Sequence, residues 1–162
     1  MNTFFAILGF LWCFPVSLLT WITFGFMYLF GQFESIVPYK YLMWVWDVED
    51  SSKLGKWMQK NGWLGFSCGN CILVRNIFRE DGSKYQRTLD HEERHCQQHY
   101  AAGVFFFLFY VLESLKIYFF CPRKHSYYDN WFEVDARTYA GQLVKIPRSA
   151  WAQGPNDRWA WW

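Results

Sequence analysis

The residues best suited to chemistry lie at positions 91–95, which read His-Glu-Glu-Arg-His and form an HExxH motif. On a helix, residues i and i+4 lie on one face about 5–6 Å apart, so His91 and His95 can point toward one metal ion. Zinc accepts imidazole nitrogen, and its catalytic sites usually have three protein ligands and an open position for water. Glu92 lies beside the pair and can take a proton from such a water. The motif therefore predicts a zinc site with Glu92 as catalytic base.

A third ligand is needed, and the sequence offers three candidates. His99 continues the i, i+4 series, but three ligands on one straight helix extend over about 12 Å of its axis, which is too far for one metal ion. Glu133 and Asp135 lie in a second amphipathic stretch, residues 130–137. Asp135 would face another direction on a helix, two residues after Glu133. We therefore expect Glu133 to complete the site, with His99 and Asp135 as alternatives.

The motif must be carried by a helix, and a strand is expected just before it. Asp90 is a candidate N-terminal cap, with Glu93 three residues later to complete a capping box, and Thr88 is the alternative cap. Residues 71–78 are apolar and rich in β-branched side chains, which predicts a strand followed by a turn. The edge of this strand is expected to pair with an extended substrate.

Residues 3–30 contain no charged side chain and are apolar almost throughout. Because about 20 apolar residues suffice to cross a bilayer, this run predicts a membrane-spanning segment over residues 1–31. Pro15 either kinks a single span or divides the run into a helical hairpin. No Lys or Arg precedes the run and several lysines follow it, so the positive-inside rule places the rest of the chain in the cytoplasm.

The rest of the chain divides into three parts by composition. Residues 32–68 mix glycine, proline, charges and tryptophan, which predicts a surface connection near the lipid headgroups. Residues 69–148 contain the HExxH motif and are expected to form the metal-binding domain. Residues 149–162 are rich in Trp and Arg, which is typical of an interfacial anchor or of a tail packed over the domain.

A second apolar stretch, residues 101–121, separates the HExxH motif from Glu133. If it crossed the membrane, the two histidines and Glu133 would lie on opposite sides and could not share a metal ion. We therefore expect a core helix, a re-entrant hairpin or a helix in the membrane interface, ended by Pro122. The expected fold is mainly α with a small β element.

Composition excludes two classes of protein. The chain is 52% hydrophobic and 23% aromatic, which excludes intrinsic disorder. Its 16 Lys and Arg are balanced by 14 Asp and Glu and are scattered, so there is no basic stripe for nucleic acid. The five cysteines include Cys68 and Cys71 in a CxxC spacing, but no second CxxC completes a zinc ligand set, and we interpret the cysteines as structural.

Three segments together resemble the gluzincin metallopeptidases: GNCILVRN (69–76), LDHEERHCQQ (89–98) and NWFEVDARTYAG (130–141). The closest resemblance is to small bacterial and phage membrane-associated peptidases with a strand, an HExxHxxQ motif, an apolar helix and an NPFExEAR-like helix. In this chain Trp131 stands where that family usually has proline, and Gln98 stands three residues beyond His95.

The resemblance implies a zincin-like domain in the bacterial inner membrane that binds Zn²⁺ and hydrolyses peptide or protein substrates. It implies zinc ligation by His91, His95 and Glu133, with Glu92 as base. Zincins also use a donor opposite the metal, for which Tyr127 and His125 are candidates. Arg137, one turn after Glu133, is expected to orient that carboxylate. The alternative is a non-catalytic membrane protein, of phage origin, whose metal site is structural or serves partner binding.

Overall fold

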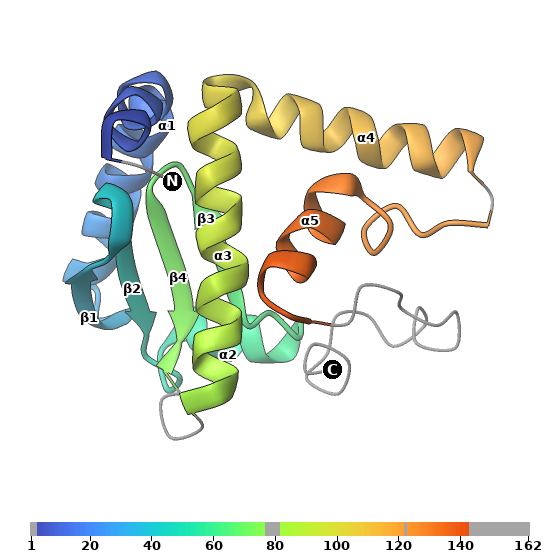
Figure 1. Cartoon of the computed structure of the whole chain (residues 1–162). Helices are drawn as coiled ribbons and strands as arrows, with labels where there is room; N and C mark the ends of the chain where they lie inside the picture. The colour runs from blue at the N-terminus through green and yellow to red at the C-terminus, as the bar shows by residue number, and fades with distance from the viewer. Residues whose placement is uncertain (1–2, 77–81, 122, 143–162) are drawn as a thin grey trace.

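The computed structural model describes residues 3–76, 82–121 and 123–142, and this part of the chain is mainly helical with one small sheet (Figure 1). The predicted fold class is confirmed. The helices are α1 (Thr3–Leu29), α2 (Lys53–Lys60), α3 (Gly82–Ala102), α4 (Phe106–Phe120) and α5 (Trp131–Tyr139), with short 3-10 helices η1 (Lys40–Leu42) and η3 (Gly103–Phe105). The strands are β1 (Phe33–Pro38), β2 (Trp44–Val48), β3 (Gly65–Cys68) and β4 (Cys71–Arg75). The tail expected at 149–162 and Pro122 lie outside the described residues.

The four strands form one sheet in the order β1-β2-β4-β3. β2 and β4 are parallel, and the other two pairs are antiparallel. β3 and β4 form a hairpin whose turn contains Gly69 with a φ of 60°, a conformation that glycine adopts without a steric cost. The strand predicted at 71–78 is confirmed over Cys71–Arg75, but the prediction that its edge is free is wrong because β4 lies between β2 and β3. Among the described residues, β3 is the edge strand on that side of the sheet.

The surface connection predicted over residues 32–68 is wrong. This region contributes β1, β2, β3 and α2, and the expected boundary at residue 68 falls inside the β3–β4 hairpin. Trp46 of β2 is fully buried and its ring packs on Phe24 of α1 and on Phe33 of β1. The tryptophans that suggested lipid headgroups thus include core residues, because large aromatic side chains suit a buried core as well as a membrane interface.

α1 is one continuous helix with Pro15 inside it, so the helical hairpin is excluded. One face is buried against the rest of the protein and consists of small and polar residues with one aromatic: Ala6, Gly9, Cys13, Ser17, Thr20 and Phe24. Gly9 allows α3 to approach closely, since a Cβ at Gly9 would lie 2.5 Å from the Cβ of Tyr100. α1 and the helical run Gly82–Phe120 are both long and apolar enough to cross a membrane.

α3 begins at Gly82, well before the caps expected at Thr88 or Asp90, so those predictions are wrong. The earlier start is stabilised by packing: Leu89 belongs to the core beneath α3, and the hydroxyl of Tyr85 donates a hydrogen bond to the buried Asp47 at 2.6 Å. The helix therefore lies on the sheet over several turns and holds the HExxH motif on a rigid support.

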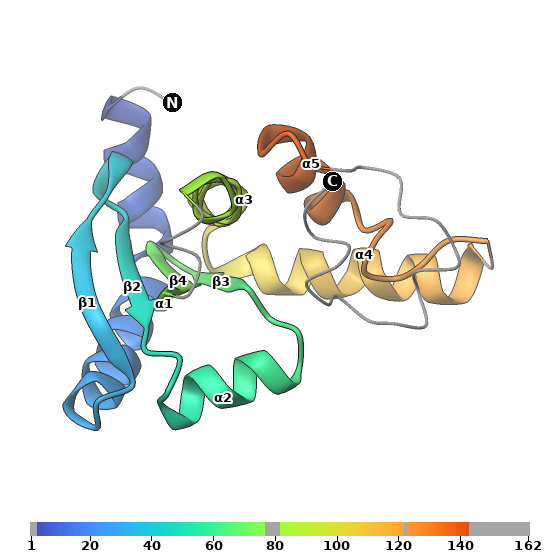
Figure 2. The ribbon, with the colours of Figure 1, turned by 90° about the horizontal axis from the view of Figure 1, so that it is seen from below.

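The apolar stretch 101–121 is neither a hairpin nor a continuation of α3. Gly103, with a φ of 59°, turns the chain in η3, and α4 then runs crosswise to α3 (Figures 1 and 2). α5 returns beneath α4 and packs on α3. Asn130 caps α5 by accepting from the Phe132 N–H, and its side-chain amide donates to Ser114 of α4. This return brings Glu133 back to the histidine pair.

Candidate metal centre

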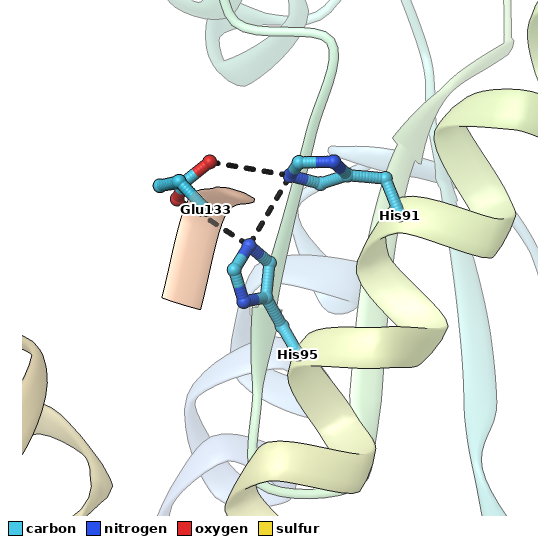
Figure 3. A group of neighbouring side chains, drawn as sticks. All are labelled: His91, His95 and Glu133. Atoms are coloured by element: carbon cyan, nitrogen blue, oxygen red, sulfur yellow. Dashed lines mark hydrogen bonds and ion pairs between the residues drawn. The ribbon is translucent and has the colours of Figure 1, made fainter. Parts of the chain in front are cut away.

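His91, His95 and Glu133 converge on one point, as the prediction requires (Figure 3). The histidines come from adjacent turns of α3 and the carboxylate from the first turn of α5. His91 Nε2 lies 3.2 Å from His95 Nε2, and Glu133 Oε2 and Oε1 lie 3.4 Å and 3.3 Å from these two nitrogens respectively. Ligands about 2.0–2.1 Å from a tetrahedral zinc ion are separated by about 3.3–3.4 Å. The two nitrogens are therefore as far apart as two ligands of one ion, each faces one oxygen of Glu133 at a similar distance, and one ligand atom from each residue lies within 4.8 Å of the others.

Two glutamines orient the imidazoles toward this point. Gln98 Oε1 lies 2.8 Å from Nδ1 of His95, and Gln142 Oε1 lies 3.0 Å from Nδ1 of His91. An amide oxygen accepts only, so in the neutral imidazoles each Nδ1 carries the proton and each Nε2 directs its lone pair inward. Metal-binding histidines usually donate the N–H of their other ring nitrogen to an acceptor in this way. The two Nε2 lone pairs and the Glu133 carboxylate repel one another, so a positive charge between them stabilises this arrangement.

The burial and the pKa of Glu133 also indicate a site that favours a positive charge. The carboxylate is 4% exposed, and its Oε2 is buried with no hydrogen-bond partner among the described residues. Burial opposes ionisation, but the imidazoles of His95 and His91 outweigh it and hold the pKa of Glu133 well below its usual range. Burial likewise lowers the pKa of His95, but Glu133 outweighs it and raises this pKa to about 9. Without a metal the site therefore favours a bound proton, which compensates the negative charge of Glu133. A divalent cation bound there would compensate the same charge.

Two neighbours fix the Glu133 carboxylate. Tyr110 of α4 donates its hydroxyl proton to Oε1 at 2.9 Å, and Arg137 Nη1 lies 3.6 Å from Oε2. Arg137 is 6% exposed and also donates to the carbonyl of Tyr128. Arg137 is therefore placed where the sequence predicted a residue that orients Glu133. Tyr110 was missed because its helix was treated only as an apolar stretch.

The alternative ligands lie elsewhere. His99 is fully buried, and its ring packs on Phe106 and Phe107 with centroids 4.0 and 5.0 Å apart. Asp135 forms a two-pronged ion pair with Arg94, at 2.7 and 3.1 Å, and accepts from the Gln98 amide at 2.8 Å. It therefore supports the glutamine that holds His95. Neither residue belongs to the metal-binding group.

Glu92, the predicted base, borders the same cavity as the three ligands. Its side chain is buried, and Ser67 of β3 borders the same cavity. Burial raises the pKa of Glu92, with the two imidazoles opposing the shift. A raised carboxyl pKa suits a group that must both take and return a proton near neutral pH.

The cavity has a volume of about 450 Å³ and a strongly apolar lining away from the ligands. One wall is β3 with the loop before it, including Trp63 and Phe66, and another is the inner side of α4, including Phe106 and Tyr110. Tyr127 also lines the cavity, whereas the lining does not include His125. The His125 Nδ1 instead accepts from the backbone N–H groups of Tyr127 and Tyr128, so it shapes the loop that carries Tyr127.

The structure brings together the three ligands predicted from the sequence and places Glu92 at the same cavity, but several supporting residues were not predicted. The role of Gln98 could have been predicted from helical spacing, because a residue three positions after His95 lies on the same face of the helix. The role of Gln142 could not, because Gln142 follows α5 by three residues and reaches His91 only through the tertiary fold. Comparisons of the chain with protein-family models, with curated proteins and with solved structures gave no match. Functional inference therefore depends on the geometry of this centre.

Proposed function

We propose that this protein is a membrane-associated, zinc-dependent peptidase whose centre is His91, His95, Glu133 and Glu92. The observation that supports this most directly is the convergence of two imidazole nitrogens, 3.2 Å apart, and the Glu133 carboxylate, whose two oxygens lie 3.3 and 3.4 Å from them. The group lies beside the buried Glu92 in an apolar cavity. Two imidazoles and one carboxylate form a ligand set found in catalytic zinc sites. Zinc held by these residues would polarise a substrate carbonyl and lower the pKa of a water molecule.

The residues of the chain supply the remaining requirements of peptide hydrolysis. Glu92 takes a proton from the attacking water, whose oxygen bonds to the carbonyl carbon. The C–N bond then breaks, and Glu92 passes the proton to the departing amine. Tyr127 borders the cavity and is the candidate to donate a hydrogen bond to the developing oxyanion.

The free edge of β3 is the proposed place for the substrate backbone. β3 pairs with β4 on one side only, and Gly65, Phe66 and Ser67 line the cavity. An extended peptide added to this edge as a further strand would pass the metal centre. The edge function that the sequence suggested for residues 71–78 thus moves to β3.

The membrane part of the proposal depends on the apolar helices. α1 exposes large apolar side chains over most of its length, including Leu11, Leu19 and Leu29 at 62%, 66% and 80%. Such a surface is far more apolar than that of a soluble monomer and suits contact with lipid. The cytoplasmic side of a bacterial inner membrane stays a prediction from charge placement.

Metal content and hydrolysis, measured on the full chain in detergent, test the proposal. We expect about one zinc per chain and cleavage of a mixed fluorogenic peptide library. Glu92→Gln should keep the zinc and reduce hydrolysis by about 10²-fold or more, because the amide cannot accept the proton. Glu34→Gln, an exposed carboxylate on β1, is the matched control and should change neither quantity.

The second candidate function is a non-catalytic membrane protein with a structural metal site. It is favoured by the packing of the centre, which joins α3 to α5 and would stabilise the fold when occupied. In that case zinc would be bound and its removal would lower the thermal stability, but the wild type would cleave no member of the library.

A further inference from the structure

Large apolar residues form most of the outward side of α4. Leu108, Val111, Leu112, Leu115 and Phe119 are each between 45% and 67% exposed. The inner side carries the residues that contact α5 and line the cavity, and buried Ile117 lies on it. Lys116 lies at the border of the outward side, where it is 57% exposed, and it pairs with Glu113, which is one turn from Ile117 and 21% exposed. Its long apolar stem allows the ammonium group to reach the lipid headgroups beside an otherwise apolar surface.

This outward side continues onto α1. The Trp12 and Phe105 rings are 6.3 Å apart, and Trp12 lies so close to Gly103 that a Cβ there would be 2.2 Å from its indole nitrogen. Beside this contact α1 exposes Phe4, Phe5, Leu8 and Leu11, at 48–64%. We call this continuous area, formed by the exposed apolar residues of α1 and of η3–α4, the α1–α4 surface.

The arrangement of the helices indicates how this surface meets a membrane. A helix that crosses a bilayer alone exposes all of its faces to lipid, whereas α1 keeps one face on the protein from Ala6 to Phe24. The polar groups under that face include Asn70, which accepts a hydrogen bond from Trp21 at 3.1 Å. α4 runs crosswise to α1, so the two helices cannot cross the same bilayer together (Figure 2). Both can lie in its surface, with α3 directed away from the lipid (Figure 1).

The metal centre then lies just below the membrane surface. Phe106, Phe107 and Tyr110 of α4 line the cavity, while Leu108, Leu112 and Leu115 on the opposite side of the same helix face outward. An α-helix with its side chains is about 10–12 Å in diameter, so only that thickness separates the cavity from the lipid. The apolar lining of the cavity is suited to side chains from a segment that has just left the membrane.

We propose that the α1–α4 surface lies in the lipid surface, and that the substrates are membrane-anchored chains cut close to the point where they leave the bilayer. This inference rests on the proposed peptidase function. An extended chain advances about 3.3 Å per residue, so the scissile bond would lie within about three to five residues of the anchor. Anchoring would also raise the local substrate concentration.

The test uses the zinc-loaded full chain in vesicles of equal phosphatidylcholine and phosphatidylglycerol. One peptide library carries a randomised segment after a Leu-Ala membrane helix of about 20 residues, and a second carries the same segment without the helix. We expect the anchored library to be cut at least about tenfold faster, with sites mapped by mass spectrometry next to the anchor. Equal rates, or sites spread evenly along the segment, would overturn this inference and leave the peptidase function standing. No cleavage of either library would instead refute the peptidase function and, with it, this inference.

A second measurement does not depend on activity. A spin label attached through Leu112→Cys should be more accessible to oxygen than to a water-soluble nickel chelate, and a label attached through Trp57→Cys on α2 should show the reverse. Trp57 is the matched control because it is an equally exposed apolar residue, at 49%, outside the α1–α4 surface. If both labels report water, the proposed orientation is wrong. The double variant Leu112→Glu and Leu115→Glu should lose the preference for anchored substrate but still cut the free library.

Discussion

Gly65 on β3 lies against Glu92 on α3 so closely that a Cβ at position 65 would be 2.8 Å from both Cγ and Oε1 of the carboxylate. The edge strand and the proposed base therefore fit together only because position 65 has no side chain. Ser67, on the same strand, lines the same cavity as Glu92. The strand that is proposed to bind substrate thus also positions the proton acceptor.

Gly65→Ala should displace Glu92 while leaving the ligands in place. We expect zinc content to be unchanged and kcat to fall by about tenfold or more, since a shift of about 1 Å at a reacting group has effects of this size. Metal analysis and peptide hydrolysis would be measured together. Gly82→Ala is the control, because a Cβ there meets nothing within 4 Å. An unchanged kcat in Gly65→Ala would argue against Glu92 as the base.

The third ligand can be tested by zinc retention after dialysis. Glu133→Ala should lose nearly all zinc, because it removes one of the three ligands. His99→Ala should retain it, because that ring packs on Phe106 and Phe107 instead. Asp135→Ala should weaken binding only mildly, through Gln98. Loss of zinc in His99→Ala with full retention in Glu133→Ala would refute the assigned ligand set.

The glutamines that orient the histidines should have a measurable effect on affinity. Gln98→Ala and Gln142→Ala each remove the acceptor at one Nδ1, so each imidazole becomes free to rotate or to change tautomer. Loss of a residue that hydrogen-bonds a metal-binding histidine typically lowers the metal affinity by about 10–100-fold. Competition with a zinc chelator would measure this change. Gln59→Ala, an exposed residue on α2, should keep the wild-type affinity.

The metal centre was largely predictable because its signals are local. The i, i+4 spacing of His91 and His95 fixes their common face on any helix, and Glu133 follows from the need for a second element. Topology supported this choice, since the ligands had to lie on one side of any membrane. Gln142 carried no such signal, because its role arises only when the chain after α5 returns to α3.

The fold was less predictable where one residue type serves two environments. Trp44 and Trp46 suggested lipid headgroups, yet Trp46 is a core residue and Trp44 packs on Trp21 of α1. Hydrophobicity alone does not distinguish lipid from a protein interior. The break between α3 and α4 depends on Gly103, whose positive φ is visible only in the structure. A single glycine in a run of apolar residues is tolerated within many helices, so it did not mark the turn.

The pH dependence of stability should report the buried thiol of Cys71, which lies outside the metal centre. Burial raises the pKa of Cys71 to about 12, whereas a thiol in an unfolded chain has a pKa of about 8.5. Between these values the unfolded chain ionises and the folded one does not. The contribution of Cys71 to stability is therefore complete below about pH 8.5 and is lost as the pH rises toward 12.

Cys71→Ala should remove this pH-dependent contribution. Urea unfolding in detergent between about pH 7.5 and 10.5 would show a decline in unfolding free energy that is shallower than in the wild type by up to about 1.4 kcal/mol per pH unit. Val45→Ala, a core substitution on the neighbouring strand β2, is the control: it removes packing but no titrating group, so its stability curve should run parallel to the wild type. If Cys71→Ala also runs parallel, the thiol of Cys71 does not titrate differently in the folded and unfolded chain, and the buried environment assigned to it beneath α1 is incorrect.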